Sequence, residues 1–191
     1  MMRRLLLPLL LLLPATLAAQ TMTLDAERQV LLLMKILTYD RQFEKKSGDA
    51  VVVGIIYMGS IPESHTALES VAQSFLKSKG KVVKKLPLKY VVIEFTTMAE
   101  VEKAVKANKV NVLYITPGLE KQLPDMIKLA QTNQLTSTTG VTAYVDKGIA
   151  VGVGFERNKP QIVINLPASK SEGSEFDASL LQIAEIKGRN K

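Results

Sequence analysis

The sequence of 191 residues contains no cysteine and no tryptophan, and its only histidine is His65. The missing thiol excludes cysteine catalysis, thiolate metal sites and disulfides, and one histidine cannot build a histidine-based metal cluster. His65 has only Glu63 near it in sequence as an orienting carboxylate, so we interpret it as a surface residue and not as a general base. We therefore expect no metal site.

Recognisable catalytic motifs are also missing. There is no Gly-x-Ser-x-Gly elbow, no Walker loop and no Gly-x-Gly-x-x-Gly fingerprint. Gly152 and Gly154 lie within a predicted strand, where they indicate close approach of another backbone. Aromatic residues make up only 5% of the chain and no arginine-rich element is present, which argues against a nucleic-acid partner. We predict a protein that is not an enzyme and uses no cofactor.

The first nineteen residues have the pattern of a secretory signal peptide. Arg3 and Arg4 precede an almost unbroken leucine run at residues 5–13, and small residues end at Ala18 and Ala19, the expected cleavage positions. An uncleaved membrane anchor is the alternative, but the run is short and the segment contains two prolines. No later run approaches 18 apolar residues, so we expect an exported, soluble mature chain.

The mature chain carries 23 basic and 18 acidic residues, a net charge of +5. Its densest basic stretch comprises Lys77, Lys79, Lys81, Lys84, Lys85 and Lys89. We interpret this stretch as solvated surface. An acidic partner or anionic lipid headgroups are the alternatives.

Strands alternate with helices along residues 20–187, which we predict to be a single domain followed by a frayed tail at 188–191. Strands are expected at 50–58, 90–95, 110–115, 134–138, 149–157 and 160–166, with a further one around 82–83 that is interrupted at Pro87. Helices are expected at 24–46, 63–79, 98–107, 119–132 and 177–186. This order predicts an α/β fold: a three-layer sandwich with a mostly parallel sheet, helices on both faces, and an antiparallel C-terminal hairpin at one edge.

Three polar turns are predicted at the carboxyl edge of this sheet. They supply six candidate ligand-binding residues: Gly59, Ser60, Thr116, Gly118, Ser137 and Thr138. Hydroxyl groups, free backbone N–H groups and helix N-termini that meet at one edge suit a small anion or polar ligand. Helix capping needs the same chemistry, and Thr116 is expected to cap a helix whose first position is Pro117.

Two further polar features are interpreted as structural. Asp40 and Arg41 are expected to form a local ion pair or cap at a helix end, with a functional role as the alternative. Asn165, at the end of the last strand, is expected to bind loop backbone, with a place in a pocket as the alternative.

A scattered series of short segments points to a known family. The series covers nearly the whole mature chain and comprises residues 35–41, 53–57, 112–116, 135–136, 147–151, 164–166 and 180–184. In order and spacing this series resembles the YfiR/HmsC-like family of exported bacterial proteins.

The resemblance implies a periplasmic α/β domain without known enzymatic activity. Characterised relatives inhibit inner-membrane diguanylate cyclases by binding their periplasmic sensor part, which lowers cyclic-di-GMP signalling. We therefore expect a regulatory binding protein whose partner is a membrane-bound signalling protein. A module that binds a small solute or anion at the carboxyl edge of the sheet is the alternative. Homo-oligomerisation is compatible with either function.

Two departures from the family pattern bear on this expectation. The aromatic-rich phrase that many relatives carry after the first helix is here residues 37–43, Leu-Thr-Tyr-Asp-Arg-Gln-Phe. The cysteine pairs of the best-known members are absent, so a redox-controlled mechanism cannot operate in this chain.

Overall fold

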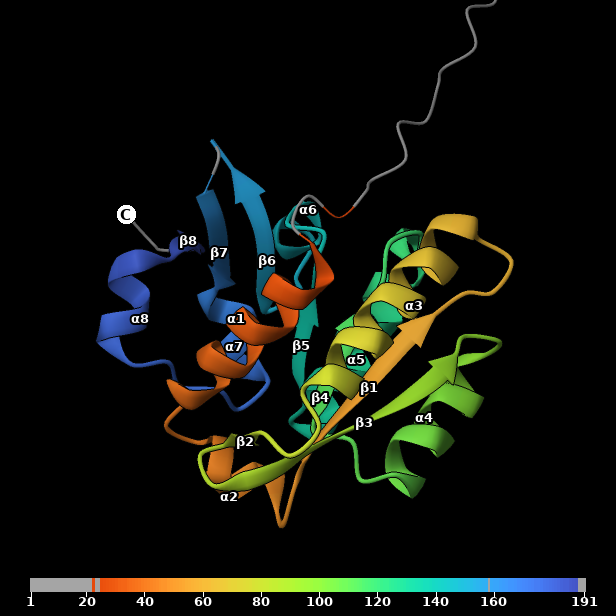
Figure 1. Ribbon diagram of the computed structural model, residues 1–191, viewed down its shortest axis with the longest axis horizontal. Coiled ribbons are helices and arrows are strands. Elements are labelled where there is room, and N and C mark those ends of the chain that lie inside the picture. The colour runs from red at the N-terminus through yellow and green to blue at the C-terminus, as the bar shows by residue number, and fades with distance from the viewer. Residues whose placement is uncertain (1–21, 23–24, 158, 189–191) are drawn as a thin grey trace, which may run out of the picture.

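One eight-stranded sheet runs through the computed structural model, which describes residue 22, residues 25–157 and residues 159–188 (Figure 1). The strand order is β2-β3-β1-β4-β5-β6-β7-β8. The strands are β1 Val51–Tyr57, β2 Val82–Val83, β3 Leu86–Glu94, β4 Val112–Ile115, β5 Thr136–Thr139, β6 Val151–Glu156, β7 Lys159–Asn165 and β8 Glu185–Lys187. The predicted signal peptide and its cleavage positions lie outside the described residues, as does the predicted tail beyond Gly188.

The centre of the sheet is parallel. Strands β3, β1, β4, β5 and β6 pair in parallel, β7 returns antiparallel to β6, and the short β8 adds in parallel outside β7. At the opposite side β2 pairs antiparallel with the start of β3. The predicted α/β sandwich and its antiparallel hairpin are therefore confirmed, with β8 as an outer strand that was not predicted.

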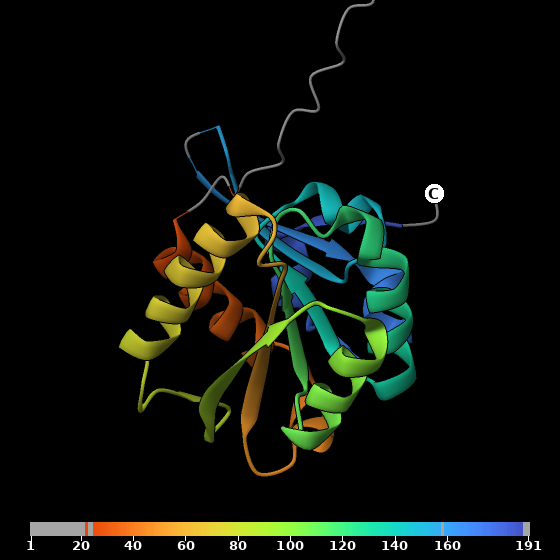
Figure 2. The same cartoon turned by 90° about the vertical axis from the view of Figure 1, so that its right-hand side faces the viewer.

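Helices cover both faces of the sheet (Figures 1 and 2). They are α1 Ala26–Thr38, α2 Phe43–Ser47, α3 Pro62–Lys77, α4 Met98–Ala107, η1 Glu120–Gln122 (a 3₁₀ turn), α5 Leu123–Asn133, α6 Ala143–Asp146, α7 Leu166–Ser171 and α8 Ala178–Ile183. Apolar side chains of α1 and α3 pack on one face, and those of α4, α5 and α6 pack on the other. A third cluster joins the end of α1 to β6, β7 and α8.

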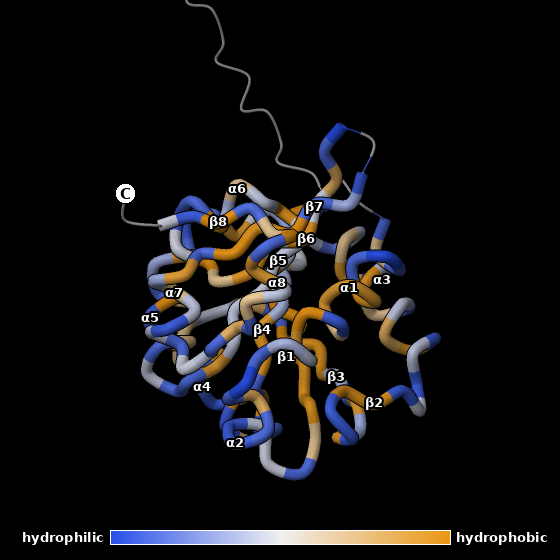
Figure 3. Tube along the Cα trace, turned by 90° about the vertical axis from the view of Figure 1, so that its left-hand side faces the viewer, coloured by the Kyte–Doolittle hydropathy of each residue, from blue (hydrophilic) through white to orange (hydrophobic). Residues whose placement is uncertain are grey.

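The buried strands explain where the core sits. Residues 51–56 of β1 and all four residues of β4 are buried, as expected for strands covered on both faces. Figure 3 shows hydrophobic residues concentrated in the central strands, while hydrophilic residues lie mainly in the surrounding helices and turns. Asn111 lies just before β4 and is also buried; its amide bonds the backbone of Val52, Ser47 and Ala50, so it fixes the entrance to β1.

Several predicted boundaries are wrong for identifiable reasons. The helix expected at 24–46 is two helices, because α1 ends at Thr38 and Asp40 forms an isolated antiparallel bridge with Phe176. Pro87 lies inside β3 without breaking it, because pairing with β1 begins only at Leu88 and no ladder donor is lost.

Two more boundaries are wrong in the C-terminal half. The helix expected from residue 119 begins at Leu123 after a 3₁₀ turn, so Thr116 and Pro117 do not start it. The helix expected at 177–186 ends at Ile183, and β8 follows. The short α7 was not predicted; it begins after Asn165, whose side chain accepts a hydrogen bond from Ala168 N–H and caps it. The structural interpretation of Asn165 is thus confirmed.

Candidate functional site

The predicted turns lie along the carboxyl edge of three adjacent parallel strands. β1, β4 and β5 are neighbours, so the segments after Tyr57, Ile115 and Thr139 leave the sheet on the same side. Gly59 and Ser60 follow β1 and are exposed, and Gly118 follows β4 and is also exposed. Ser137 and Thr138, however, lie within β5 and are buried.

The Thr116 hydroxyl joins three elements beneath this edge. It donates to the Ile56 carbonyl at 2.9 Å and lies 2.7 Å from the Ser64 hydroxyl at the start of α3. Ser64 in turn accepts a hydrogen bond from Met58 N–H at 2.9 Å. Both hydroxyl groups are fully buried. Their hydrogen bonds hold the ends of β1, β4 and α3 together.

Gly118 lies in the turn after β4 and contacts Tyr144. Its N–H donates to the Tyr144 hydroxyl at 3.0 Å, and its φ of +85° lies in the left-handed region that favours glycine. A Cβ at this position would lie 2.6 Å from Ile61 Cγ2. Glycine is therefore required here by backbone conformation and by space.

Ser137 and Thr138 point in opposite directions because they are consecutive in a strand. The Thr138 hydroxyl donates to the Leu113 carbonyl at 2.8 Å. The Ser137 hydroxyl donates to Glu172 at 2.5 Å and accepts from Ala150 N–H at 2.9 Å. The structure thus gathers Gly59, Ser60 and Gly118 on the surface of the edge, and it uses the other three side chains inside the protein.

A cavity of about 350 Å³ lies beside this edge, between α3 and the turn after β4. Its lining is mostly apolar, with Glu63, Thr66 and Ser70 as the polar members. The full lining is Met22, Pro62, Glu63, Thr66, Ala67, Ser70 and Pro117. The cavity adjoins the predicted site only through Pro117, the neighbour of Thr116 and Gly118.

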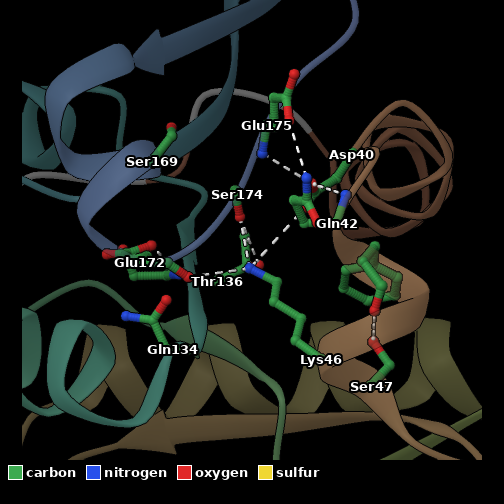
Figure 4. A network of polar contacts seen from close by, with 12 residues as sticks. Asp40, Gln42, Lys46, Ser47, Gln134, Thr136, Ser169, Glu172, Ser174 and Glu175 are labelled. Carbon is green, nitrogen blue, oxygen red and sulfur yellow. Dashed lines mark hydrogen bonds and ion pairs between the residues drawn. The ribbon is translucent and has the colours of Figure 1, made fainter.

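A buried charged network, which the sequence analysis missed, lies at the opposite, amino end of β5 (Figure 4). At its centre, Lys46 Nζ donates to the Ser174 hydroxyl at 2.6 Å and to the Glu172 carbonyl at 3.1 Å. It lies 3.6 Å from Asp40 Oδ2, as the counter-ion of a carboxylate that is fully buried. The other oxygen, Asp40 Oδ1, accepts from the N–H groups of Gln42 and Glu175.

Glu172 forms the second half of this network. Its carboxylate accepts from Ser137 N–H at 2.8 Å and from the Ser137 hydroxyl, and it is fully buried. Burial raises the pKa of Glu172 to about 7, although the Ser137 hydrogen bonds and the charge of Lys46 act in the opposite direction. Burial likewise lowers the pKa of Lys46. For both charges the free-energy cost of desolvation therefore exceeds the stabilisation by their hydrogen bonds and by the opposite charges nearby.

The network cross-links segments that are distant in sequence. Arg41 extends it at the surface, where its guanidinium pairs with Asp177 at 2.8 Å and with Glu175 at 3.5 Å. The local ion pair expected between Asp40 and Arg41 is wrong, because Arg41 pairs with Glu175 and Asp177. The expected local cap is confirmed for Asp40, which accepts from Gln42 N–H and in addition from Glu175 N–H. The only sign of this network in the sequence is the polar run at residues 169–175, and that run does not reveal that it contacts the segment around Asp40 and Lys46.

Two observations limit the chemistry that the described residues offer. Within residues 25–157 and 159–188, no cluster of three or more histidine, aspartate or glutamate side chains is arranged to hold a metal ion. Asp40 and Glu172, the two carboxylates buried among the described residues, are 0% exposed and form cross-links within the protein. In the part of the chain that the structure describes, no helix has the length and apolar character to cross a bilayer.

Comparison with solved structures shows a similar fold in three other bacterial proteins. A conserved domain protein from Vibrio cholerae O1 biovar El Tor superposes with a TM-score of 0.59 at 18% identity, covering 86% of this chain and 61% of that chain. An ABC domain from Streptococcus pneumoniae, solved in complex with L-Trp, gives 0.60 at 15% identity, with coverage of 85% and 62%. A ligand-free, open substrate-binding protein with adhesive properties from Clostridium difficile gives 0.54 at 16% identity, with coverage of 76% and 57%.

This chain therefore spans about three fifths of the length of these structures, and at such low identity the likeness concerns the fold alone. Comparison with curated protein sequences gives no match. The YfiR/HmsC-like family, in contrast, matches residues 29–185, from α1 to β8. That match covers most of the chain and every central element of the sheet. The chain belongs to the YfiR/HmsC-like family.

Proposed function

We propose that this protein is a periplasmic, non-enzymatic regulator that controls a membrane-bound signalling partner, such as a diguanylate cyclase, by direct protein contact. The observation that carries the proposal is the family match over residues 29–185. Membership supports a periplasmic regulatory or binding module as the general class. The signal peptide predicted at residues 1–19 supports export, and the cyclase is the specific partner that the family resemblance implies.

The internal bonding of the carboxyl edge supports contact through a surface. Thr116 and Thr138 bond to strand carbonyls, and Ser137 bonds to Glu172, so these hydroxyls are not free to bind a solute. Of the six candidate residues, the exposed ones are Gly59, Ser60 and Gly118, which together offer one side-chain hydroxyl. A regulator that binds a protein needs no enclosed polar pocket.

The proposal is tested in living cells by making export the variable. The full chain and a matched chain that begins at residue 20 are expressed in a strain that carries membrane-bound diguanylate cyclases, and cyclic-di-GMP is measured. We expect the full chain to lower cyclic-di-GMP and the matched chain, retained in the cytoplasm, to leave it unchanged. Full-length protein recovered from the periplasm with no change in cyclic-di-GMP would refute the cyclase as partner.

The cavity beside α3 supports a second candidate function, the binding of a small polar ligand. Its volume of about 350 Å³ suits a small solute, and Glu63 and Thr66 provide polar contacts on a mostly apolar wall. A panel of amino acids, phosphate and sulfate, each tested by thermal shift, examines this candidate. A ligand present at one hundred times its Kd stabilises by about 2.7 kcal/mol, or about 5–10 °C in a chain of this size.

Two matched variants test whether such a ligand binds in this cavity. Thr66→Trp fills the cavity from an exposed position of α3, whereas Glu69→Trp adds the same side chain at an exposed position outside the cavity. We expect the first variant to abolish the thermal shift and the second to retain it. Equal shifts in the two variants would place the ligand elsewhere.

A further inference from the structure

The outer edge of β3 is an open strand edge for most of its length. β1 pairs with β3 from Leu88 to Glu94, but the register with β2 covers only Leu86 and Pro87. Among the described residues, no strand pairs with the outer side of residues 88–94, which we call the β3 edge. Figure 2 shows β3 along the side of the sheet that faces the viewer, with no strand in front of it.

The backbone of the β3 edge presents unused hydrogen-bonding groups in a known pattern. Phe95 N–H donates to Tyr57 O in β1 at 2.7 Å, and Leu88 N–H donates outward to Lys81 O at 3.3 Å. Successive residues of a strand face alternate sides, so the N–H and C=O groups of Tyr90, Val92 and Glu94 point outward. These groups form the template that strand addition requires.

The side chains divide the β3 edge into a protected half and an open half. Natural proteins guard strand edges with lysine and proline, and here Pro87 and Lys89 lie in the first half of β3, with Lys81 and Lys85 just before the strand in sequence. From Tyr90 to Ile93 there is no charge, and Val92 is 47% exposed. Tyr90 is held in place by stacking on Phe75, with ring centroids 5.7 Å apart. The second half therefore offers an ordered, apolar and unguarded edge.

The charge beside the first half of this edge is positive and unpaired, and Glu94 places one negative charge at its other end. Lys79, Lys81, Lys85 and Lys89 are exposed, and none of them forms an ion pair with a described residue. The other two lysines of the stretch are engaged: Lys77 pairs with Glu27 at 3.2 Å, and Lys84 donates to the Asp40 carbonyl at 2.6 Å. A partner that brings carboxylates to the four free lysines gains attraction and faster association.

We propose that the β3 edge binds an extended, acidic segment of the partner protein by strand addition. The segment's backbone bonds the outward groups of Tyr90, Val92 and Glu94, and its carboxylates lie beside the four free lysines. A second copy of this chain is the poorer occupant, because the mature chain is itself basic, with a net charge of +5. The inference rests on the proposed function in one respect, that the segment belongs to the membrane-bound signalling partner.

A single substitution separates this mode of binding from ordinary surface contact. Val92→Pro removes the outward N–H and leaves every hydrogen bond to β1 in place, because residues 91, 93 and 95 face β1. Val92→Thr keeps the N–H and the branched shape and is the matched control. The charge variants are Lys79→Glu with Lys81→Glu, matched by Lys121→Glu with Lys170→Glu at exposed, unpaired positions elsewhere among the described residues.

The test uses twelve-residue peptides selected from a displayed library on the mature chain. We expect the selected peptides to combine β-branched residues with aspartate or glutamate. Val92→Pro should weaken their binding at least about tenfold, since it removes one hydrogen bond and leaves the peptide's carbonyl unpaired. Val92→Thr should retain binding. The Lys79/Lys81 pair should weaken binding in a salt-dependent manner, and the control pair should not.

Hydrogen exchange on the unmodified protein tests the same contact even if Val92→Pro does not fold. The amides of Val92 and Glu94 should exchange rapidly in the free protein and become protected when a selected peptide is added. Failure to select any peptide, equal binding by Val92→Pro and Val92→Thr, or unchanged exchange at Val92 would each overturn the inference. A dimer of the mature chain that Val92→Pro dissociates would also overturn it, by assigning the edge to a second copy.

The outcome for the β3 edge is distinguishable from that for the proposed function. If the full chain lowers cyclic-di-GMP and Val92→Pro lowers it equally, the edge inference fails and the regulator stands. If neither lowers cyclic-di-GMP, the regulator fails, and the peptide selection alone decides the edge.

Discussion

The raised pKa of Glu172 leads to a quantitative prediction for the stability of this protein. The folded protein holds the Glu172 proton up to a pH of about 7, whereas an unfolded chain releases it near the usual value of 4.5. Between these values the folded state binds one proton more than the unfolded state. Its free energy of unfolding must therefore fall as the pH rises from about 4.5 to about 7, and this contribution is fully present only below that window.

The size of the effect follows from the shift. At about 1.4 kcal/mol for each pKa unit, the difference corresponds to about 3 kcal/mol across the window. The pKa of Asp177 is lowered, mainly by the Ser179 N–H and Arg41. It contributes stability that is lost only as the pH falls below the usual range of an aspartate, so its effect lies outside the window.

The assay is urea denaturation, which gives the free energy of unfolding. It is run at half-unit steps from pH 4.5 to pH 8 on the unmodified protein and on Glu172→Gln. Glutamine has nearly the same size and does not titrate, so the slope should disappear. The difference in unfolding free energy between the two proteins should then change by about 3 kcal/mol over the window. Parallel curves for the two proteins would refute the reasoning, since they would show that Glu172 titrates alike in the folded and unfolded states.

Three other substitutions test the contacts that hold the fold. Lys46→Met leaves the buried Asp40 carboxylate without its counter-ion and should lower the unfolding free energy by about 3 kcal/mol; a loss under about 1 kcal/mol in urea would contradict the geometry of Figure 4. Asn111→Ala removes three hydrogen bonds to backbone and should cost about 2–4 kcal/mol by the same assay, with an unchanged midpoint as the opposing result. Gly118→Ala combines a positive φ with a clash at Ile61 and should cost about 1–3 kcal/mol; thermal unfolding at the midpoint of the unmodified protein would argue against it.

Much of the fold follows from local patterns in the sequence. The uninterrupted apolar residues of β1 and β4 predict strands covered on both faces, and the structure buries them so. Thr97 caps α4 by accepting from Glu100 N–H, as its place before an amphipathic helix predicts. The alternation of such strands with helices is enough to predict a parallel sheet with helices on both faces.

The candidate site was only partly predictable. Residues that end adjacent parallel strands were expected to meet at one edge, and Gly59, Ser60 and Gly118 do so. The direction of each side chain was not predictable, because it depends on where each strand ends. β5 runs to Thr139, so Ser137 turns toward Glu172 and Thr138 toward Leu113.

By itself the sequence determined the fold class and the family, because both are encoded in short-range order: periodicity, capping residues and short motifs in a fixed sequence. Its basic, leucine-rich start predicts export in the same way. Tertiary structure alone decided the rest. Glu172 and Lys46 are 126 positions apart, and burial in a shared interior is the largest cause of the shift in the pKa of each. The β3 edge likewise exists only because β2 is too short to cover it, and that follows from strand pairing, which no local pattern records.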